Sequence, residues 1–449
     1  MSRFPKNNSL FHFREKIFVR DPSVVADYYT LNAEERRGLI ENIAERELMG
    51  LTSLLKESKK KAFQRGERRF QALTQSEIAT PVYVIDEALM EENMRIMQYV
   101  KDRTGCKILH ALKAYATYAT FSLMRQYLDG VCASGLYEAR LGYEEFGKEV
   151  HTFSVAYREE EFDEILKYSQ VVIFNSFPQL RKFASRVKAV GVEVGVRVNP
   201  GYSEVETAMY NPCLPYSRLG VIHDIFEREY PAHKEDINGL HFHVLCEQNA
   251  DVLKRVVDNF EKLYGKYLIN LKWVNFGGGH HISRDDYELE TLINLINTFQ
   301  KKYGVTVYLE PGEANVLLAG VLISKVLDIV RNEREIAIMD ASAEAHMPDV
   351  LLMPYRPHVL LSGAPYEKEY TYRLAGPTCL AGDIIGDYSF DAPLRVGDKL
   401  VFTDMAHYSI VKNNMFNGIN LPDIALMGSD GNFKVIRKFT YADYKARLA

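Results

Sequence analysis

The feature that most constrains the fold is a regular alternation of short β-rich runs with segments of helical length, which begins near residue 80. Such alternation predicts repeated βα units on a parallel sheet. Eight runs follow the first one, and eight strands close a (β/α)8 TIM barrel. The pattern leaves open whether the first run, residues 81–86, joins the barrel or a second domain. The runs are PVYVID, KILHALKA, GVCAS, VHTFSV, VVIFNS, VEVGVRVNP, GLHFHVL, LKWVNFGGG and TVYLEPGEA.

Two regions depart from this alternation. Residues 1–78 are strongly charged, with apolar residues at helical spacing and no strand signal, which predicts a helical extension. We favour an arm that packs on the body or on a partner subunit over a regulatory segment. After about residue 314, β-type runs are separated by turn residues, which predicts a mostly antiparallel β-domain. The predicted domains are therefore the extension (1–78), the barrel (79–315) and the C-terminal β-domain (316–449).

Composition excludes several classes of protein. The balance of 55 basic against 60 acidic residues gives a net charge of −5 and no sign of a nucleic acid partner. No apolar run reaches the roughly 18 residues of a membrane span, and the first residues lack the apolar core of a secretory signal. We therefore expect a cytoplasmic protein without a membrane partner. The five cysteines are scattered without a Cys-x-x-Cys pair, which indicates free thiols.

Chemically unusual residues stand at the ends of five predicted barrel strands. In a parallel barrel, catalytic groups come from the carboxyl ends of the strands. Lysine is the most demanding of them, because an unpaired ammonium taken out of water costs several kcal/mol and needs an exit to solvent or a chemical role. The residues are Lys113 in KILHALK, Arg197 in VGVRV, His241 and His243 in GLHFHV, Gly277–Gly279 after LKWVNF, and Glu310 after TVYL.

Each of these residues alone has an ordinary explanation. A strand-end lysine can reach the surface, glycines can serve packing, and Glu310 before a proline can simply end a strand. The HFH pair could hold a metal, because residues two apart point the same way. Apart from the weaker pair His280 and His281, we find no third ligand at suitable spacing, so no metal is predicted.

Together the residues supply what pyridoxal 5′-phosphate needs. They offer an amine for a Schiff base, a flat group to lie against the ring, a glycine turn for the phosphate and a carboxylate for the pyridine nitrogen. A carboxylate there keeps that nitrogen protonated, which makes the ring an electron sink. Covalent capture of this cofactor would explain why Lys113 is tolerated.

Five ordered stretches resemble carboxynorspermidine (carboxyspermidine) decarboxylases, members of the alanine-racemase-like enzymes that include ornithine and diaminopimelate decarboxylases. The resemblance covers residues 79–449. It implies pyridoxal phosphate-dependent decarboxylation of carboxynorspermidine or carboxyspermidine to norspermidine or spermidine, in polyamine biosynthesis, by a homodimer with active sites at the interface. The stretches are HALKA (110–114), GLHFHVLCE (239–247), NFGGGHHI (275–282), LEPGEA (309–314) and GPTCLAGD (376–383).

The resemblance also implies a role for each site residue. Lys113 forms the imine with the cofactor, His243 stacks on its ring and Glu310 pairs with its pyridine nitrogen. Gly277, Gly278 and Gly279 hold the phosphate together with Tyr408 of DMAHYS, and Arg197 lies near the cofactor. Cys379 crosses the dimer interface and helps to protonate the α-carbon after carbon dioxide leaves; its ordinary alternative is a buried small hydrophobic residue.

Three further residues bear on the substrate. Glu313 stands where ornithine and diaminopimelate decarboxylases typically carry arginine, which favours a polyamine chain over a second carboxylate. Asp383 is a weaker candidate for a substrate amine, because such an aspartate is more often a turn residue. Arg356 in LLMPYRPHV has an open role. The alternative functions are decarboxylation of ornithine, lysine or diaminopimelate, or a non-catalytic regulatory homologue, against which the presence of both Lys113 and Cys379 argues.

Overall fold

The computed structural model describes residues 55–449, of which residues 58–449 form one compact unit. The predicted helical extension therefore falls mostly outside the described residues, and its last part, residues 58–73, is helical. This helix is fastened by the guanidinium of Arg69, which pairs with the buried carboxylate of Asp86 and donates to the carbonyl of Ser429. The predicted boundaries at 78/79 and 315/316 stay a prediction.

Eight parallel strands close the predicted barrel in chain order. Their runs are short and largely apolar because both faces of a parallel strand are covered. In β5, for example, all four residues are buried. The strands are β2 (Lys107–Ala111), β3 (Gly130–Ala133), β4 (Glu149–Phe153), β5 (Val171–Phe174), β6 (Glu193–Arg197), β7 (Gly239–His241), β8 (Trp273–Asn275) and β9 (Thr306–Leu309).

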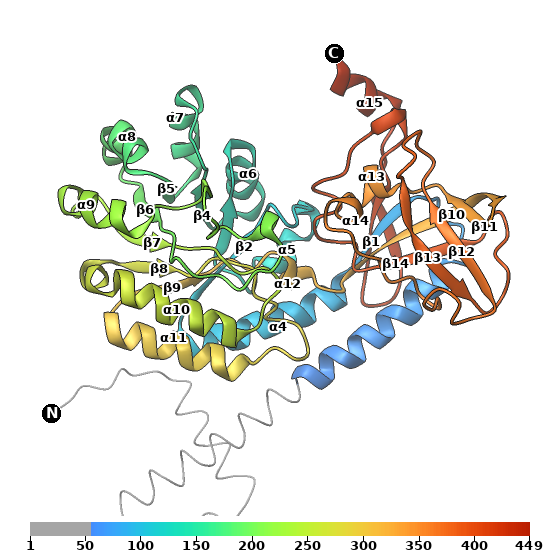
Figure 1. Ribbon diagram of the computed structural model, residues 1–449, viewed down its shortest axis with the longest axis horizontal. Helices are drawn as coiled ribbons and strands as arrows, with labels where there is room; N and C mark the ends of the chain where they lie inside the picture. The colour runs from blue at the N-terminus through green and yellow to red at the C-terminus, as the bar shows by residue number, and fades with distance from the viewer. Residues whose placement is uncertain (1–54) are drawn as a thin grey trace, which may run out of the picture. The chain divides into compact units, whose positions relative to one another are not determined.

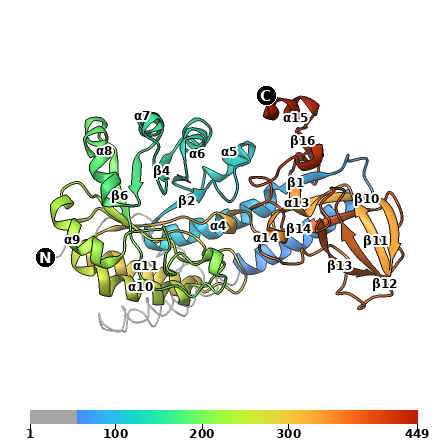
Figure 2. The ribbon, with the colours of Figure 1, turned by 45° about the horizontal axis from the view of Figure 1, so that its top comes forward.

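The outer helices surround these strands, as Figures 1 and 2 show. The longer helices turn an apolar stripe inward; in α10 the buried residues Val252, Val256 and Phe260 recur at helical spacing. The helices are α4 (Glu87–Thr104), α5 (Phe121–Met124), α6 (Leu136–Leu141), α7 (Glu159–Tyr168), α8 (Phe177–Val190), α9 (His223–His233), α10 (Ala250–Tyr264), α11 (Leu289–Tyr303) and α12 (Glu313–Val316), with short turns at η1 (Tyr118–Thr120), η2 (Gly142–Phe146), η3 (Ala208–Tyr210) and η4 (Gly265–Asn270).

Trp273, the single tryptophan of the chain, fills much of the barrel interior. A Cβ on Gly239 of β7 would lie 2.1 Å from its indole ring, so glycine is needed where the ring crosses the neighbouring strand. The indole Nε1 donates a hydrogen bond of 2.9 Å to Glu193 at the start of β6. The amino ends of the strands are thus closed by packing, which leaves the carboxyl ends for the site.

The second part of the unit is the predicted, mostly antiparallel sheet. The run PVYVID belongs here, because β1 pairs antiparallel with β10 and parallel with β15. The strands are β1 (Val82–Asp86), β10 (Gly320–Asn332), β11 (Arg334–Met339), β12 (Tyr370–Ala375), β13 (Ile384–Phe390), β14 (Lys399–Thr403), β15 (Asp423–Met427) and β16 (Phe433–Arg437), with α13 (Ala343–His346), α14 (Asp349–Leu352), η5 (Phe416–Gly418) and α15 (Tyr441–Leu448) between or after them.

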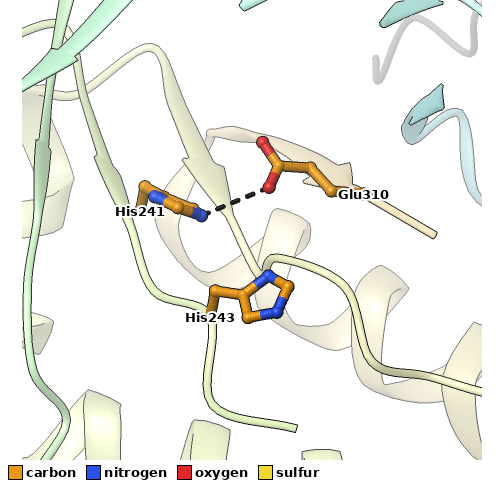
Figure 3. A group of neighbouring side chains, drawn as sticks. All are labelled: His241, His243 and Glu310. Atoms are coloured by element: carbon orange, nitrogen blue, oxygen red, sulfur yellow. Dashed lines mark ion pairs between the residues drawn. The ribbon is translucent and has the colours of Figure 1, made fainter. Parts of the chain in front are cut away.

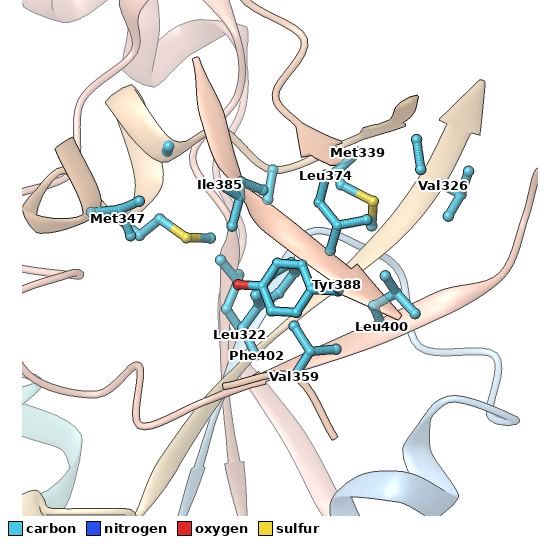
Figure 4. Close-up of a cluster of buried hydrophobic side chains, with 14 of the residues drawn as sticks. Leu322, Val326, Met339, Met347, Val359, Leu374, Ile385, Tyr388, Leu400 and Phe402 are labelled. Carbon is cyan, nitrogen blue, oxygen red and sulfur yellow. The ribbon is translucent and has the colours of Figure 1, made fainter. Parts of the chain in front are cut away.

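A second hydrophobic core stabilises this sheet (Figure 4). Leu322 of β10, Leu374 of β12 and Phe402 of β14 are fully buried in it, so it joins strands that are distant in sequence. Tyr388 lies in the same core, and its hydroxyl donates a hydrogen bond of 2.6 Å to the carbonyl of Pro357.

Among residues 55–449, no helix is both long enough and apolar enough to cross a bilayer.

Candidate active site

The strand-end residues predicted from the sequence converge on one region of the barrel. A cavity of about 920 Å³ is lined by Lys113, Arg197 and His243, among others. A smaller pocket is lined by Lys113 and His243 together with Glu310. The two pockets therefore meet at Lys113 and His243. The amine of Lys113, the imidazole of His243 and the carboxylate of Glu310 thus share one site.

Lys113 follows β2 and borders both pockets. Its side chain has surface toward the large cavity, yet the surrounding protein keeps the amine poorly solvated. Burial lowers the pKa of this amine, and nearby Arg197 lowers it further, although the carboxylate of Glu310 acts in the opposite sense. A lowered pKa raises the fraction of neutral amine, which is the form that attacks an aldehyde.

Glu310, directly after β9, is held ionised inside the protein (Figure 3). Its Oε1 accepts a hydrogen bond of 2.7 Å from Asn275 Nδ2, and its Oε2 lies 3.3 Å from His241 Nε2. Burial alone would raise the pKa of this carboxyl, but the contacts to His241 and Asn275 bring it to about 2. The site therefore contains a fixed negative charge.

His243 presents a neutral ring. Its Nδ1 accepts a hydrogen bond of 3.0 Å from the amide of Gly278, which leaves the proton on Nε2. Burial, together with the nearby cations Lys113 and Arg197, holds its pKa well below the ordinary value. Arg197 itself is buried, donates to the carbonyl of His243 at 3.0 Å and lies 4.7 Å from the ring centre of Phe153. The loop after β7 is thus fixed by a cation.

The turn Gly277–Gly279 passes where side chains do not fit. Gly277 and Gly279 have φ angles of +72° and +81°, and a Cβ on Gly279 would lie 1.9 Å from the carbonyl oxygen of Leu245. The amide of Gly277 donates to Asn275 Oδ1 and that of Gly278 to His243. Only Gly279 of the three lines a pocket, so the geometry leaves its amide as the best placed to meet a phosphate.

Three other predicted residues also line the large cavity. Tyr408 and Glu313 border both pockets, whereas Arg356 borders only the large one. The guanidinium of Arg356 lies 4.8 Å from the ring centre of Tyr388 and donates to two backbone carbonyls. This engagement orders its own loop and leaves its role toward a ligand open.

Two predicted residues line neither of the two pockets described above. Cys379 is exposed, and its amide donates to Asn417 Oδ1 at 2.6 Å. Asp383 is buried, and its carboxylate accepts hydrogen bonds from Ser342 Oγ and from the amide of Ala343. Asp383 therefore orders a turn of its own chain, and its predicted role toward a substrate amine stays a prediction.

The argument that no third ligand accompanies the two histidines of HFH also needs correction. One donor atom from each of His241, His243 and Glu310 lies within 4.8 Å of the others. Sequence spacing did not reveal this, because Glu310 comes from a strand that is distant in the sequence. The expected absence of a metal stays a prediction.

A cluster of acids and imidazoles at the large cavity was missed as a unit. It consists of Glu247, His281, Glu313, Asp404 and His407. Four sequence segments contain these residues: GLHFHVLCE, GGGHHI, EPGEA and DMAHYS. The segments are far apart in the sequence, and nothing in it shows that they meet in the fold.

Comparisons with known proteins agree with the architecture. A family model described as "Pyridoxal-dependent decarboxylase, C-terminal sheet domain" matches residues 51–406. A carboxynorspermidine/carboxyspermidine decarboxylase of Campylobacter jejuni is 44% identical over 82% of this chain and 98% of its own length. A carboxyaminopropylagmatine decarboxylase of Synechocystis sp. is 39% identical over 83% and 96%. The crystal structure of carboxynorspermidine decarboxylase complexed with norspermidine, from Campylobacter jejuni, is similar with a TM-score of 0.77 at 43% identity, over 82% of this chain and 100% of that chain.

Proposed function

The chain belongs to the pyridoxal-dependent decarboxylase family, and from this membership we propose that it converts carboxynorspermidine or carboxyspermidine to norspermidine or spermidine. The observation that carries the proposal is the convergence of Lys113, His243 and Glu310 on one site. The 44% identity to a decarboxylase of these substrates sets the substrate class.

The residues present fit pyridoxal phosphate. The site offers a desolvated amine, a neutral flat imidazole, an ionised carboxylate and a glycine turn that has no room for side chains. Lys113 would hold the aldehyde carbon, His243 a ring face, Glu310 the pyridine nitrogen, and Gly279 with Tyr408 the phosphate. When bound, the cofactor supplies an aldehyde for the substrate amine and a ring that accepts the electron pair left by carbon dioxide.

The residues of the chain then divide the work. Lys113 would supply the amine that holds the cofactor's aldehyde carbon, and ionised Glu310 would keep a proton on the ring nitrogen because a nearby negative charge favours the protonated form. In the net reaction the substrate would lose carbon dioxide and gain one proton at the α-carbon. Arg197, which fixes the loop of His243, keeps the imidazole face in place.

We further propose a homodimer in which Cys379 serves the site of the other copy. Its exposure and its absence from both pockets of its own chain support this assignment. Mixing Lys113→Ala with Cys379→Ala should restore about a quarter of wild-type activity, because half of randomly assorted dimers then contain one intact site out of two. No recovery in an isolated mixed dimer would contradict the shared site.

We also propose a cytoplasmic location, which is supported by the five free cysteines, Cys379 among them.

The direct test is carbon dioxide release by the cofactor-loaded protein from carboxynorspermidine, carboxyspermidine, ornithine and diaminopimelate. We expect kcat/KM to be highest for the first two. Lys113→Ala should abolish turnover and the visible (yellow) imine absorbance, whereas Lys301→Ala, on the outer face of α11, should change neither. Faster turnover of ornithine or diaminopimelate would overturn the substrate assignment.

Carboxyaminopropylagmatine is the second candidate substrate, favoured by the 39% identity to its decarboxylase. It carries a guanidinium in place of an ammonium at its distal end. The same carbon dioxide assay with carboxyaminopropylagmatine decides between this substrate and the carboxylated polyamines. All of them share the reacting α-amino acid end, so a difference in kcat/KM reports the distal end.

A further inference from the structure

The acid and imidazole cluster at the large cavity has more negative charge than its own cations offset. His407 Nε2 lies 3.2 Å from Asp404 Oδ1 and 3.6 Å from Glu313 Oε1. Despite burial, these carboxylates raise the pKa of His407 to about 9, so it is cationic at neutral pH. Imidazolium His407 and the ammonium of buried Lys59, which interacts with Asp404, face the three carboxylates of Asp404, Glu313 and Glu247, so an excess of anionic charge remains.

Glu247 carries the clearest sign of a missing cation. Its side chain is exposed toward the cavity, yet partial desolvation raises the pKa of its carboxyl, and the negative charges of Glu313 and Asp404 raise it further. Its backbone is held at φ +54°, and its carbonyl accepts a hydrogen bond of 3.2 Å from Arg284 Nη1. The loop therefore keeps Glu247 beside other carboxylates although their charges repel.

His281 provides a second observation that points to a ligand. It is 6% exposed, and its Nε2 makes no hydrogen bond to another described residue, although Glu313 Oε1 lies 3.2 Å away. Both His281 and Glu313 line the small pocket as well as the large cavity. A buried nitrogen of this kind normally finds a partner. The cluster is therefore built to accept something from the cavity.

The geometry fits one ammonium group. One donor atom from each of Glu247, His281 and Glu313 lies within 4.8 Å of the others. Charge-assisted N–H···O bonds are about 2.8 Å long, so a single nitrogen can bond two oxygens with this separation. The same cavity is lined by Lys113, where the reacting end of the substrate would be held.

We propose that Glu247 and Glu313 form a clamp for a distal ammonium of the polyamine chain. The inference rests on the proposed function, since it names the group that holds the far end of that substrate. A divalent metal ion is the competing occupant, and imidazolium His407, 3.6 Å from Glu313, disfavours a dication more strongly than a single positive charge.

The test compares binding of two amines to the cofactor-loaded protein by titration calorimetry. Norspermidine has two terminal ammonium groups, whereas N-propyl-1,3-diaminopropane has the same chain with one terminal amine replaced by hydrogen. Glu247→Gln and Glu313→Gln should weaken norspermidine binding by about 10- to 100-fold, the range expected for a hydrogen bond to a charged group. Both should leave the propyl analogue nearly unchanged. Glu235→Gln, an exposed carboxylate elsewhere, is the matched control.

Each outcome decides a different claim. Equal losses for both amines, or no loss for either, would overturn the clamp. Binding of one equivalent of Mn²⁺ or Zn²⁺ that Glu247→Gln abolishes would replace it by a metal site. If the clamp pattern holds but wild type releases no carbon dioxide from carboxynorspermidine, the proposed reaction fails and the clamp stands.

Discussion

Replacing His407 by glutamine should destabilise the protein in a pH-dependent way. The side chain is 14% exposed and lies within 3.2 Å of Asp404 and 3.6 Å of Glu313. Its pKa rises from 6.5 to about 9 in the folded protein. At 1.4 kcal/mol per pKa unit, this shift corresponds to about 3 kcal/mol of stability. The pKa values of Asp404 and Glu313 are shifted downward, which agrees with the same ion pairs.

The sign follows from a folded pKa that lies above the unfolded one. The contribution of His407 is complete below about pH 6.5 and disappears as the pH rises through 9. Urea unfolding of wild type and His407→Gln should therefore differ by about 3 kcal/mol near pH 6, about 2 kcal/mol near pH 7.5 and almost nothing near pH 9.5. His223→Gln on the outer helix α9 is the control. A loss that is equal at all three pH values would refute the assignment of a positive charge to His407.

Two further predictions concern packing around the site and its supports. Arg69→Ala should lower the free energy of unfolding by about 3 kcal/mol, because it leaves the fully buried carboxylate of Asp86 without its ion pair. Urea unfolding measures this loss, and an unchanged midpoint would contradict the prediction. Gly278→Ala should weaken pyridoxal phosphate binding at least tenfold, because the new Cβ would lie 2.2 Å from the carbonyl oxygen of Glu310. An absorbance titration should show this loss, while the control Lys301→Ala, on the outer face of α11, binds the cofactor normally.

The fold was largely predictable from the sequence because parallel strands leave continuous apolar runs bounded by turns. The barrel order and the antiparallel sheet were both confirmed. The place of β1 stayed open, because its five residues are all buried and such a run looks the same in either sheet. Only pairing with β10 and β15, more than two hundred residues away, decides it. The edge strand β16 leaves little signal, since none of its residues is fully buried.

The site was predictable where chemistry coincides with a strand end. Lys113, His243 and Glu310 each follow a barrel strand (β2, β7 and β9), so closure of the barrel brings them to the same end. The proposed clamp was not predictable, because Glu247 follows β7, Glu313 begins α12 and their neighbour His407 follows β14, and only tertiary packing brings these segments together. The sequence also does not show that amide and hydroxyl donors occupy the carboxylate of Asp383, whose role toward a substrate stays a prediction.

Asn275 explains how the carboxylate and the glycine turn are held as one unit. Its Nδ2 donates to Glu310 Oε1 at 2.7 Å while its Oδ1 accepts from the amide of Gly277 at 2.8 Å. An aspartate would keep the second bond but place a like charge against Glu310, and a leucine would leave both partners unpaired in a buried place. The amide of asparagine donates on one side and accepts on the other, as both partners require. The fixed negative charge at Glu310 and the turn that faces the cavity therefore depend on one side chain at the end of β8.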